Sequence, residues 1–195
     1  MKPSKVEYNE LWKKLPWKKF RRNLFRLQVR LYKASRANDV SRVRNLQKLI
    51  LRSQSARFLA IRQVTQLNQG KKTAGIDGKK SLTFKERFLL SDVLRENVFK
   101  WVHKSLREIP IPKKDGTTRT LKIPTMKDRA WQKLVLYALE PAHEAHFHAN
   151  SYGFRTGRSA QDAQTHIFLN LSSNKNGLRK RVLELDIEKC VRRDR

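Results

Sequence analysis

The sequence predicts an α+β protein in which helices dominate, and three observations support this prediction. Apolar residues recur at helical spacing from Trp17 to about Asn68. Prolines in the stretch "LREIPIPKKDGTTRTLKIPT" exclude a helix there, and its Asp-Gly pair is typical of a β-hairpin turn. The later stretch "RVLELDI" alternates as a strand does. Helical segments outnumber extended ones, so few strands are expected.

Three helices are expected in the N-terminal part. The first, "WKKFRRNLFRLQVRLYKASR", has an apolar stripe of Phe20, Leu24, Leu27 and Leu31. The second begins after Asn38 and Asp39, both favourable N-cap residues, and its stripe consists of Val43, Leu46, Leu49 and Ile50. The third, "SARFLAIRQVTQLN", carries Phe58, Ile61 and Val64. We expect these residues in the core, together with most of Trp12, Trp17, Trp101 and Trp131.

The loop "NQGKKTAGIDGKK" marks a boundary in composition, and further elements follow it. A helix over "SLTFKERFLLSDVLRENVFKW" has Ser81 or Thr83 as its cap. The hairpin pairs "EIPIPK" with "RTLKIPT". A helix over "DRAWQKLVLYALEPAHEAHF" is expected to end near Pro141. One more helix, "SAQDAQTHIFLNLSS", is capped by Ser159 and precedes the strand "RVLELDI".

The composition indicates a polyanionic partner. The chain of 195 residues holds 45 Lys and Arg against 17 Asp and Glu, a formal net charge of +28. Such an excess favours nucleic acid over a merely basic surface, since neutralised phosphates release counterions. Cys190 is the only cysteine, and no apolar run is long enough for a membrane span or a secretory signal. We therefore expect a cytoplasmic protein with no membrane partner.

The hairpin concentrates cations on two extended strands around a glycine turn. They are Lys113, Lys114, Arg119 and Lys122. Because alternate residues of a strand face the same way, several of these cations can converge on a triphosphate or a nucleic-acid backbone. The alternative is an edge hairpin whose lysines only prevent aggregation.

The stretch "SYGFRTGRSAQDA" combines aromatic and basic residues with small ones. They are Tyr152, Phe154, Arg155 and Arg158. Aromatic faces stack on bases while guanidinium groups hold phosphates, which fits a nucleic-acid contact. An ordinary loop-to-helix junction with a buried aromatic residue is the alternative.

The stretch "LELDIE" ends a predicted strand with Asp186. Phosphoryl-transfer sites often hold Mg²⁺ with a carboxylate placed in this way, usually together with a second carboxylate and a second metal ion. A surface aspartate at the end of a strand is the commoner arrangement.

In this order, "TAGIDG", "IPKKDGTTRTLKIPTMKDRAWQ", "SYGFRTGRSAQDA" and "LELDIEKC" closely resemble the N-terminal half of group II intron-encoded reverse transcriptases with maturase activity. The resemblance extends from about Trp12 to Cys190. It implies a helical, RNA-binding N-terminal extension over residues 1–72 and a partial reverse transcriptase domain over residues 73–195. The latter would comprise the fingers and the first palm strand of a truncated right-hand polymerase.

The same resemblance assigns roles to residues. Lys113 and Arg119 would grip the triphosphate of the incoming dNTP, and Lys122 and Arg129 would lie along that surface or the template path. The template groove would be lined by Tyr152, Phe154, Arg155 and Arg158. Asp186 would be the first catalytic, metal-binding aspartate, with the carbonyl of Ile187 as a co-ligand for Mg²⁺.

The sequence departs from the family's pattern after the cysteine. An aromatic residue and a second aspartate are expected there, but Val191, Arg192 and Arg193 follow, and no "YxDD" turn is present. One aspartate cannot hold two Mg²⁺ ions, so we expect this polypeptide to bind RNA (intron or template-primer) without polymerising DNA. A palm and thumb fragment could complement it. The alternatives are a stand-alone module that assists intron RNA folding and a general basic protein with accidental likeness.

Overall fold

The structure of the protein is a computed structural model and describes residues 5–114, 116–172 and 179–185. The chain divides into two compact units, Met1–His146 and Phe147–Arg195. The α-helices of the described residues are α1 (Lys5–Lys13), α2 (Trp17–Arg36), α3 (Val40–Arg52), α4 (Gln54–Arg62), α5 (Phe84–Asn97), α6 (Met126–Glu144) and α7 (Ala160–Leu171). A π-helical turn, η1 (Gln63–Leu67), and a 3₁₀ turn, η2 (Gln69–Lys72), follow α4. The strands are β1 (Arg107–Pro112) and β2 (Thr118–Ile123).

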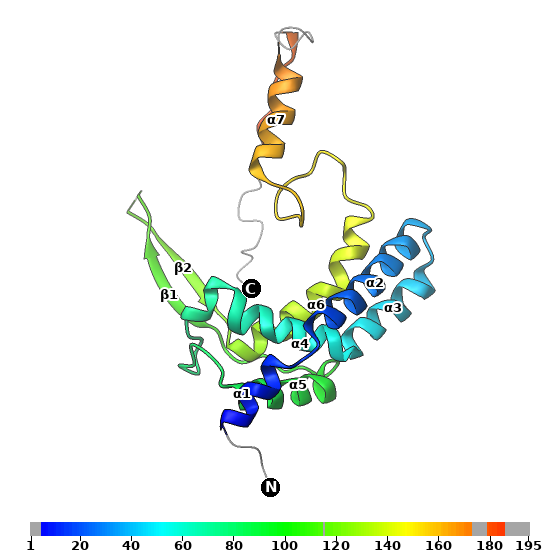
Figure 1. Ribbon diagram of the computed structural model, residues 1–195. Helices are drawn as coiled ribbons and strands as arrows, with labels where there is room; N and C mark the ends of the chain where they lie inside the picture. The colour runs from blue at the N-terminus through cyan, green and yellow to red at the C-terminus, as the bar shows by residue number, and fades with distance from the viewer. Residues whose placement is uncertain (1–4, 115, 173–178, 186–195) are drawn as a thin grey trace. The chain divides into compact units, whose positions relative to one another are not determined.

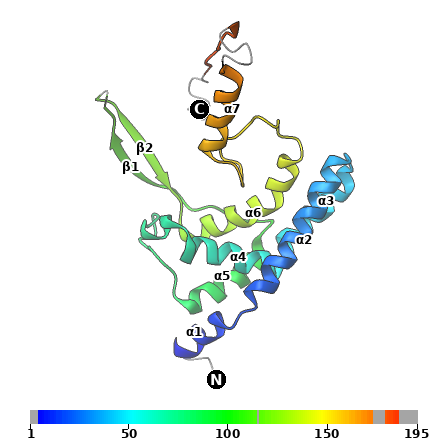
Figure 2. The ribbon, with the colours of Figure 1, turned by 45° about the horizontal axis from the view of Figure 1, so that its top comes forward.

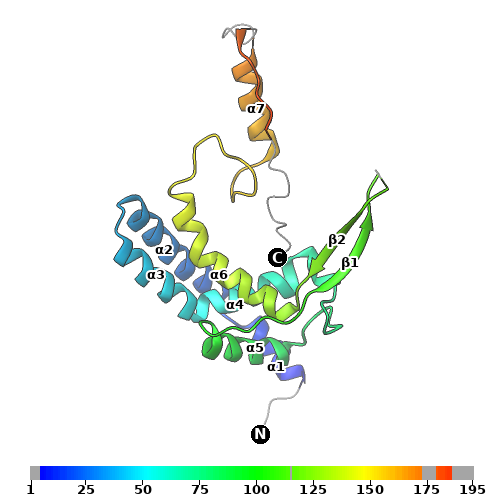
Figure 3. The same ribbon diagram turned by 180° about the vertical axis from the view of Figure 1, so that it is seen from behind.

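The first unit is a helical body from which one β-hairpin projects (Figures 1 and 3). Helices α2 and α3 lie side by side, and α6 packs against α2, α3 and α4 (Figure 2). The turn between α2 and α3 uses the predicted pair of residues: Asn38 has a φ of 55°, and the side chain of Asp39 accepts a hydrogen bond from the backbone N–H of Arg42 at 2.9 Å. The helix-dominated α+β class is confirmed.

The core of the first unit has two apolar clusters, and most of the predicted core residues lie in them. One cluster contains Trp12, Phe20 and Phe58, and the other contains Leu31 and Ile50. The remaining tryptophans pack partly buried against these clusters. Leu49 is the exception, because it is 47% exposed on the outer face of α3. Trp12 belongs to α1, a helix that the sequence pattern did not predict.

The predicted end of α6 near Pro141 was wrong, because the helix continues to Glu144. Pro141 has no N–H to donate to the carbonyl of Tyr137, four residues earlier. That carbonyl accepts a hydrogen bond from Nε2 of Gln28 on α2 at 3.3 Å instead. A neighbouring helix therefore satisfies the acceptor that proline leaves open, and the helix passes through the proline.

The predicted strand "RVLELDI" is also not found where the structure describes it. Residues 181–185 form no strand, and Val182, Leu183 and Leu185 are exposed. A strand needs a partner for its backbone hydrogen bonds, and in the described part of the chain β1 pairs only with β2. Asp186 and Ile187 lie outside the described residues.

The second unit contains α7, which begins with the predicted cap. Oγ of Ser159 accepts from the N–H of Asp162 at 3.2 Å, and the Asp162 carboxylate accepts in return from the N–H of Ser159 at 2.8 Å. No residue of α7 is buried. Within the described ranges of the chain, no helix has the length and apolarity needed to cross a membrane.

Candidate nucleic-acid interface

The hairpin is a regular antiparallel pair in which Ile111 lies opposite Arg119 and Glu108 lies opposite Lys122. At its tip the N–H of Lys113 donates to the carbonyl of Thr117 at 2.8 Å, which continues the register by one more pair. Gly116 adopts a φ of 77°, as the glycine of a three-residue hairpin loop does. The predicted hairpin and its glycine turn are confirmed.

This register decides which cations share a face. Residues alternate across a strand, so Lys113 and Arg119 lie on the same face, next to Ile111. Lys122 lies on the opposite face, where its Nζ is 3.3 Å from Oε1 of Glu108. Lys113, Lys114 and Arg119 are exposed. Two of the predicted cations are therefore brought together, while Lys122 is separated from them.

Arg129, at the start of α6, fastens the base of the hairpin to the preceding loop. Its guanidinium group donates to the carbonyls of Pro124 at 2.9 Å, Gly70 at 2.7 Å and Thr73 at 2.8 Å. Desolvation by burial lowers the pKa of this group. The guanidinium donors of Arg129 are thus directed at backbone carbonyls of its own chain, and the residue holds the base of the hairpin in place.

The loop "TAGIDG" packs tightly on the same junction. A Cβ atom at Gly75 would lie 2.7 Å from Cα of Thr125 and 2.9 Å from the carbonyl oxygen of Pro124. Only a glycine allows the loop to approach the backbone this closely. The sequence therefore places a glycine where the base of the hairpin and the loop meet.

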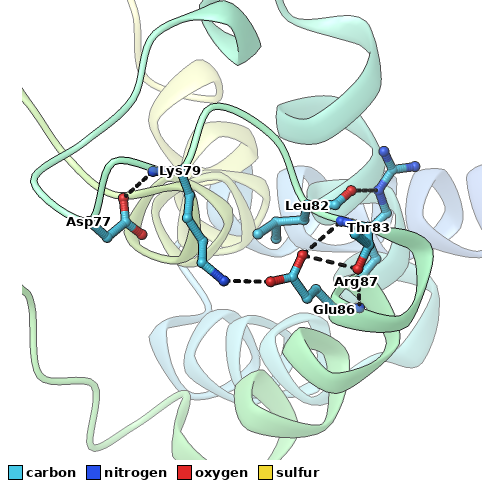
Figure 4. Close-up of polar contacts among 6 residues, drawn as sticks. All are labelled: Asp77, Lys79, Leu82, Thr83, Glu86 and Arg87. Atoms are coloured by element: carbon cyan, nitrogen blue, oxygen red, sulfur yellow. Dashed lines mark hydrogen bonds and ion pairs between the residues drawn. The ribbon is translucent and has the colours of Figure 1, made fainter.

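The far end of this loop is tied to α5 (Figure 4). The backbone N–H of Lys79 donates to Asp77, and Nζ of Lys79 donates to Oε1 of Glu86. Glu86 also completes a capping box with Thr83, one of the two candidate caps: Oε2 accepts from the N–H of Thr83 at 2.8 Å, and Oγ1 of Thr83 accepts from the N–H of Glu86 at 3.3 Å. The lysine thus joins the loop to the N-terminal cap of the helix.

A basic pocket that the sequence did not predict lies beside this loop, with a volume of about 370 Å³. Its lining includes Lys79, Lys100, Lys104 and Lys127. The buried carboxylate of Asp128 accepts from Nε1 of Trp101 at 2.8 Å and from Oγ1 of Thr125 at 2.6 Å, so that acid is used in packing. The lysines come from three segments, which are the loop before α5, the segment after α5 and the start of α6, so no single local motif indicated them.

A second concavity, of about 590 Å³, lies where α2, α4, η1 and α6 meet, and we call it the α2 groove. Its lining includes Arg21, Arg22, Phe25, Arg62, Leu67 and Tyr137. Phe25 is 65% exposed. Sequence reasoning missed this groove, although one feature indicated it: Phe25 is a bulky apolar residue outside the stripe of Phe20 and Leu24.

In the second unit, the stretch around Tyr152 is held by its own side chains. Arg155 donates to the carbonyls of His148 at 2.7 Å and Ser151 at 2.5 Å. The guanidinium group of Arg158 lies 5.8 Å from the ring centroid of Tyr152. Phe154 is fully exposed at a φ of 58°. Within this unit, Phe154 and Arg158 are accessible to a ligand, while Arg155 organises the loop.

No group of three or more His, Cys, Asp or Glu side chains that could hold a metal ion occurs among the described residues. The predicted magnesium ligands, Asp186 and the carbonyl of Ile187, lie outside them.

Two family models match the chain, and they match consecutive parts of it. Residues 12–94 match the N-terminal domain of reverse transcriptase. Residues 111–193 match reverse transcriptase (RNA-dependent DNA polymerase). The chain is also 44% identical over 171 residues to Maturase-like protein 1 of Euglena gracilis, a match that covers 88% of this chain and 37% of that protein.

Two further relatives also match most of this chain and less than half of their own length. Maturase-like protein 1 of Euglena longa is 37% identical over 179 residues, which are 91% of this chain and 39% of the relative. Protein YkfC of Escherichia coli (strain K12) is 32% identical over 155 residues, which are 77% of this chain and 40% of the relative. The chain thus spans about two fifths of the length of the curated relatives it matches.

Proposed function

The chain belongs to the group II intron reverse transcriptase/maturase family. We propose that it forms the N-terminal part of an RNA-directed DNA polymerase, the part that binds RNA and the incoming nucleotide. In this proposal residues 1–72 are the RNA-binding extension, and residues 73–195 are the fingers and the first palm strand. The observation that carries it is the hairpin face on which Lys113 and Arg119 lie together.

The hairpin suits a triphosphate for electrostatic reasons. A lysine and an arginine on one face offer a point charge and a planar fork of donors, and both favour phosphate oxygens. Arg129 and Gly75 hold the base of the hairpin against its own loop, so these cations are carried on an anchored element. Lys122 would contact the template path from the opposite face, and Arg129 would support this surface.

The remaining site residues complete the proposal. Phe154 and Tyr152 would stack on template bases, while Arg158 would contact phosphates and Arg155 would keep the loop in place.

The family is one of metal-dependent polymerases, and Asp186 with the carbonyl of Ile187 would supply ligands for Mg²⁺. RNA, a DNA primer and dNTPs are the proposed partners. A single cysteine, Cys190, fits a cytoplasmic location.

Photocrosslinking with 4-thio-dTTP tests the role of the hairpin. We expect the chain to be labelled, and we expect Lys113→Ala combined with Arg119→Ala, which removes the proposed contacts to the triphosphate, to remove most of the label. Lys122→Ala is the matched control, because it removes one cation from the opposite face and should leave the labelling nearly unchanged. Equal labelling of all variants would refute nucleotide binding by this face.

We further propose that a polypeptide of these 195 residues does not extend a primer unaided. Two Mg²⁺ ions need several shared carboxylates, and Asp186 is the sole member of that set that the resemblance assigns within this sequence. Primer extension with Mg²⁺ and dNTPs should stay at background. Extension that Asp186→Ala abolishes would overturn the proposal. Activity restored by adding a palm and thumb fragment would support it.

A stand-alone RNA-binding module is the second candidate function, and one observation favours it. Every Lys and Arg of α2 is exposed, and the helix contains no acidic residue. Such a surface can bind phosphates without any polymerase site. The two candidates differ in the crosslinking experiment: a pure RNA-binding module would bind RNA but take no label from 4-thio-dTTP that depends on Lys113 and Arg119.

A further inference from the structure

We propose that the α2 groove binds an unstacked base of single-stranded RNA, with the flanking phosphates on its arginines. This inference rests on the proposed RNA binding by the N-terminal helices and adds where, and in which form, the RNA is held.

The apolar lining of the groove is exposed at two positions where burial would be expected. Phe25 on α2 is 65% exposed, and Leu67 on η1 is 60% exposed. Phe25 lies next to Leu24, which faces the core and is 5% exposed, so the ring points away from the stripe that packs the helix. An exposed aromatic ring beside a concavity is what a stacking platform for bases requires.

Arginines surround this lining. Arg21 and Arg22 are exposed on α2, and the guanidinium group of Arg62 lies 4.5 Å from the ring centroid of Trp17, which fixes its position. In the part of the chain that the structure describes, these three arginines form no salt bridge with an acid. Among the described residues, no acidic one lines the groove either. The groove therefore selects an anionic ligand with a flat apolar part.

Polar groups that could contact base edges are also present. Gln63 and Tyr137 line the groove, as does Gln28, whose Nε2 already donates one hydrogen bond to the carbonyl of Tyr137. Burial, with a smaller contribution from Glu140, raises the pKa of Tyr137 to about 12, so its hydroxyl stays neutral and can donate. Amide and hydroxyl groups around an aromatic face are the usual means of contacting a splayed base.

The size of the groove favours a single strand over a duplex. A volume of about 590 Å³ lies in the range of pockets that hold one small ligand, whereas paired bases are stacked inside a helix and cannot enter. An acidic amphipathic peptide would also match an apolar groove with basic edges. RNA is favoured because the exposed cations continue along the whole of α2, which suits an extended chain of phosphates.

A single-stranded oligoribonucleotide with 2-aminopurine at a central position tests the proposal on the full chain. Stacking on Phe25 should quench the fluorescence of this base. Phe25→Ala should abolish the quenching and weaken binding roughly tenfold, in line with the loss of one base stack. Phe25→Trp should keep both. Arg21→Ala combined with Arg22→Ala should weaken binding without abolishing the quenching.

Two matched controls separate stacking from general effects. Phe99→Ala removes another aromatic ring, 54% exposed and outside the groove, and Lys85→Ala removes an exposed cation of α5, outside residues 1–72. Each should change affinity less than about twofold. Circular dichroism should be the same for all variants, which is expected because none of these side chains is buried.

The outcomes distinguish this inference from the proposed function. Salt-sensitive RNA binding with no quenching, and equal affinity of Phe25→Ala and Phe99→Ala, would overturn the groove proposal and leave RNA binding intact. Absence of any salt-sensitive RNA binding would overturn both. If Phe25→Ala weakens binding only to an amphipathic Glu/Leu helical peptide, with RNA affinity unchanged, the groove binds protein and the proposal is wrong.

Discussion

Arg129 donates to three backbone carbonyls: that of Pro124, just before α6, and those of Gly70 and Thr73, which join the start of α6 to the segment before α5. Hydrogen bonds to a charged group are the stronger kind, and the half-buried carbonyl of Pro124 loses this donor, which adds a further cost. We predict that Arg129→Ala lowers the free energy of unfolding by about 3 kcal/mol. Urea denaturation measures this, and Arg119→Ala, an exposed arginine of β2, should stay within about 0.5 kcal/mol.

Gly75 tests the same junction from the side of the loop. In Gly75→Ala the new Cβ would lie 2.7 Å from Cα of Thr125, which is backbone and cannot move aside alone. We predict a loss of about 1–3 kcal/mol in the free energy of unfolding, as for overpacking. Gly70→Ala is the control, because its Cβ would have its nearest neighbours at 3.8 Å. Equal stability of both variants would show that the loop does not depend on this contact.

Single residues differed in how far the sequence could predict their position. Alternation along a strand places Lys113 and Arg119 on one face once the register is known, and the hairpin turn fixes that register. The engagement of Arg129 could not be foreseen. Its acceptors on Gly70 and Thr73 lie more than fifty residues away in the chain, and no local pattern records such a contact.

Among the elements, α5 provides a prediction of pH dependence through its capping box. The hydrogen bond from Lys79, and next that from the N–H of Thr83, lower the pKa of Glu86 below its ordinary value of 4.5. A lowered pKa means that the folded state favours the carboxylate, so this stabilisation is present above pH 4.5 and is lost as the pH falls through the folded-state pKa.

We therefore predict that Glu86→Gln lowers stability at pH 7 and makes the loss of stability below pH 4.5 shallower than in the parent protein. The urea midpoint measured at neutral pH and at about pH 3 gives the result. Glu96→Gln removes a carboxylate from the C-terminal turn of the same helix without touching the cap. If both variants show the same pH profile, the capping box is not the source of the effect.

The helices and the hairpin were predictable because local chemistry defines them. The caps at Asp39, Thr83 and Ser159 each satisfy backbone N–H groups that a helix leaves open, and each was recognisable from residue type. The end of α6 was not, because Gln28, on a helix that is distant in sequence but packs against α6, supplies the donor that Pro141 makes necessary. Local patterns predict an element well until another element changes its boundary.

At the scale of the first unit, the concavities depend on how helices pack, and the sequence alone did not reveal them. The α2 groove takes residues from four elements, and the lysines of the other pocket come from separate segments. Charge is different, because it follows from composition. The formal net charge of +28 and the uniformly basic α2 predict binding to a polyanion before any packing is known.

The salt dependence of RNA binding measures how many of these cations act. On single strands the slope of log K against log salt is about −0.7 for each phosphate contacted. We predict a slope of about −3 or steeper between roughly 50 and 200 mM salt, measured by filter binding.

Arg26→Gln combined with Arg30→Gln, both exposed on α2, should make the slope shallower by about 1.4. Arg95→Gln removes a cation that already lies beside Asp92 and Glu96, so it should leave the slope unchanged. If all three substitutions act in proportion to the charge removed, net charge alone explains the binding and α2 is not the contact surface.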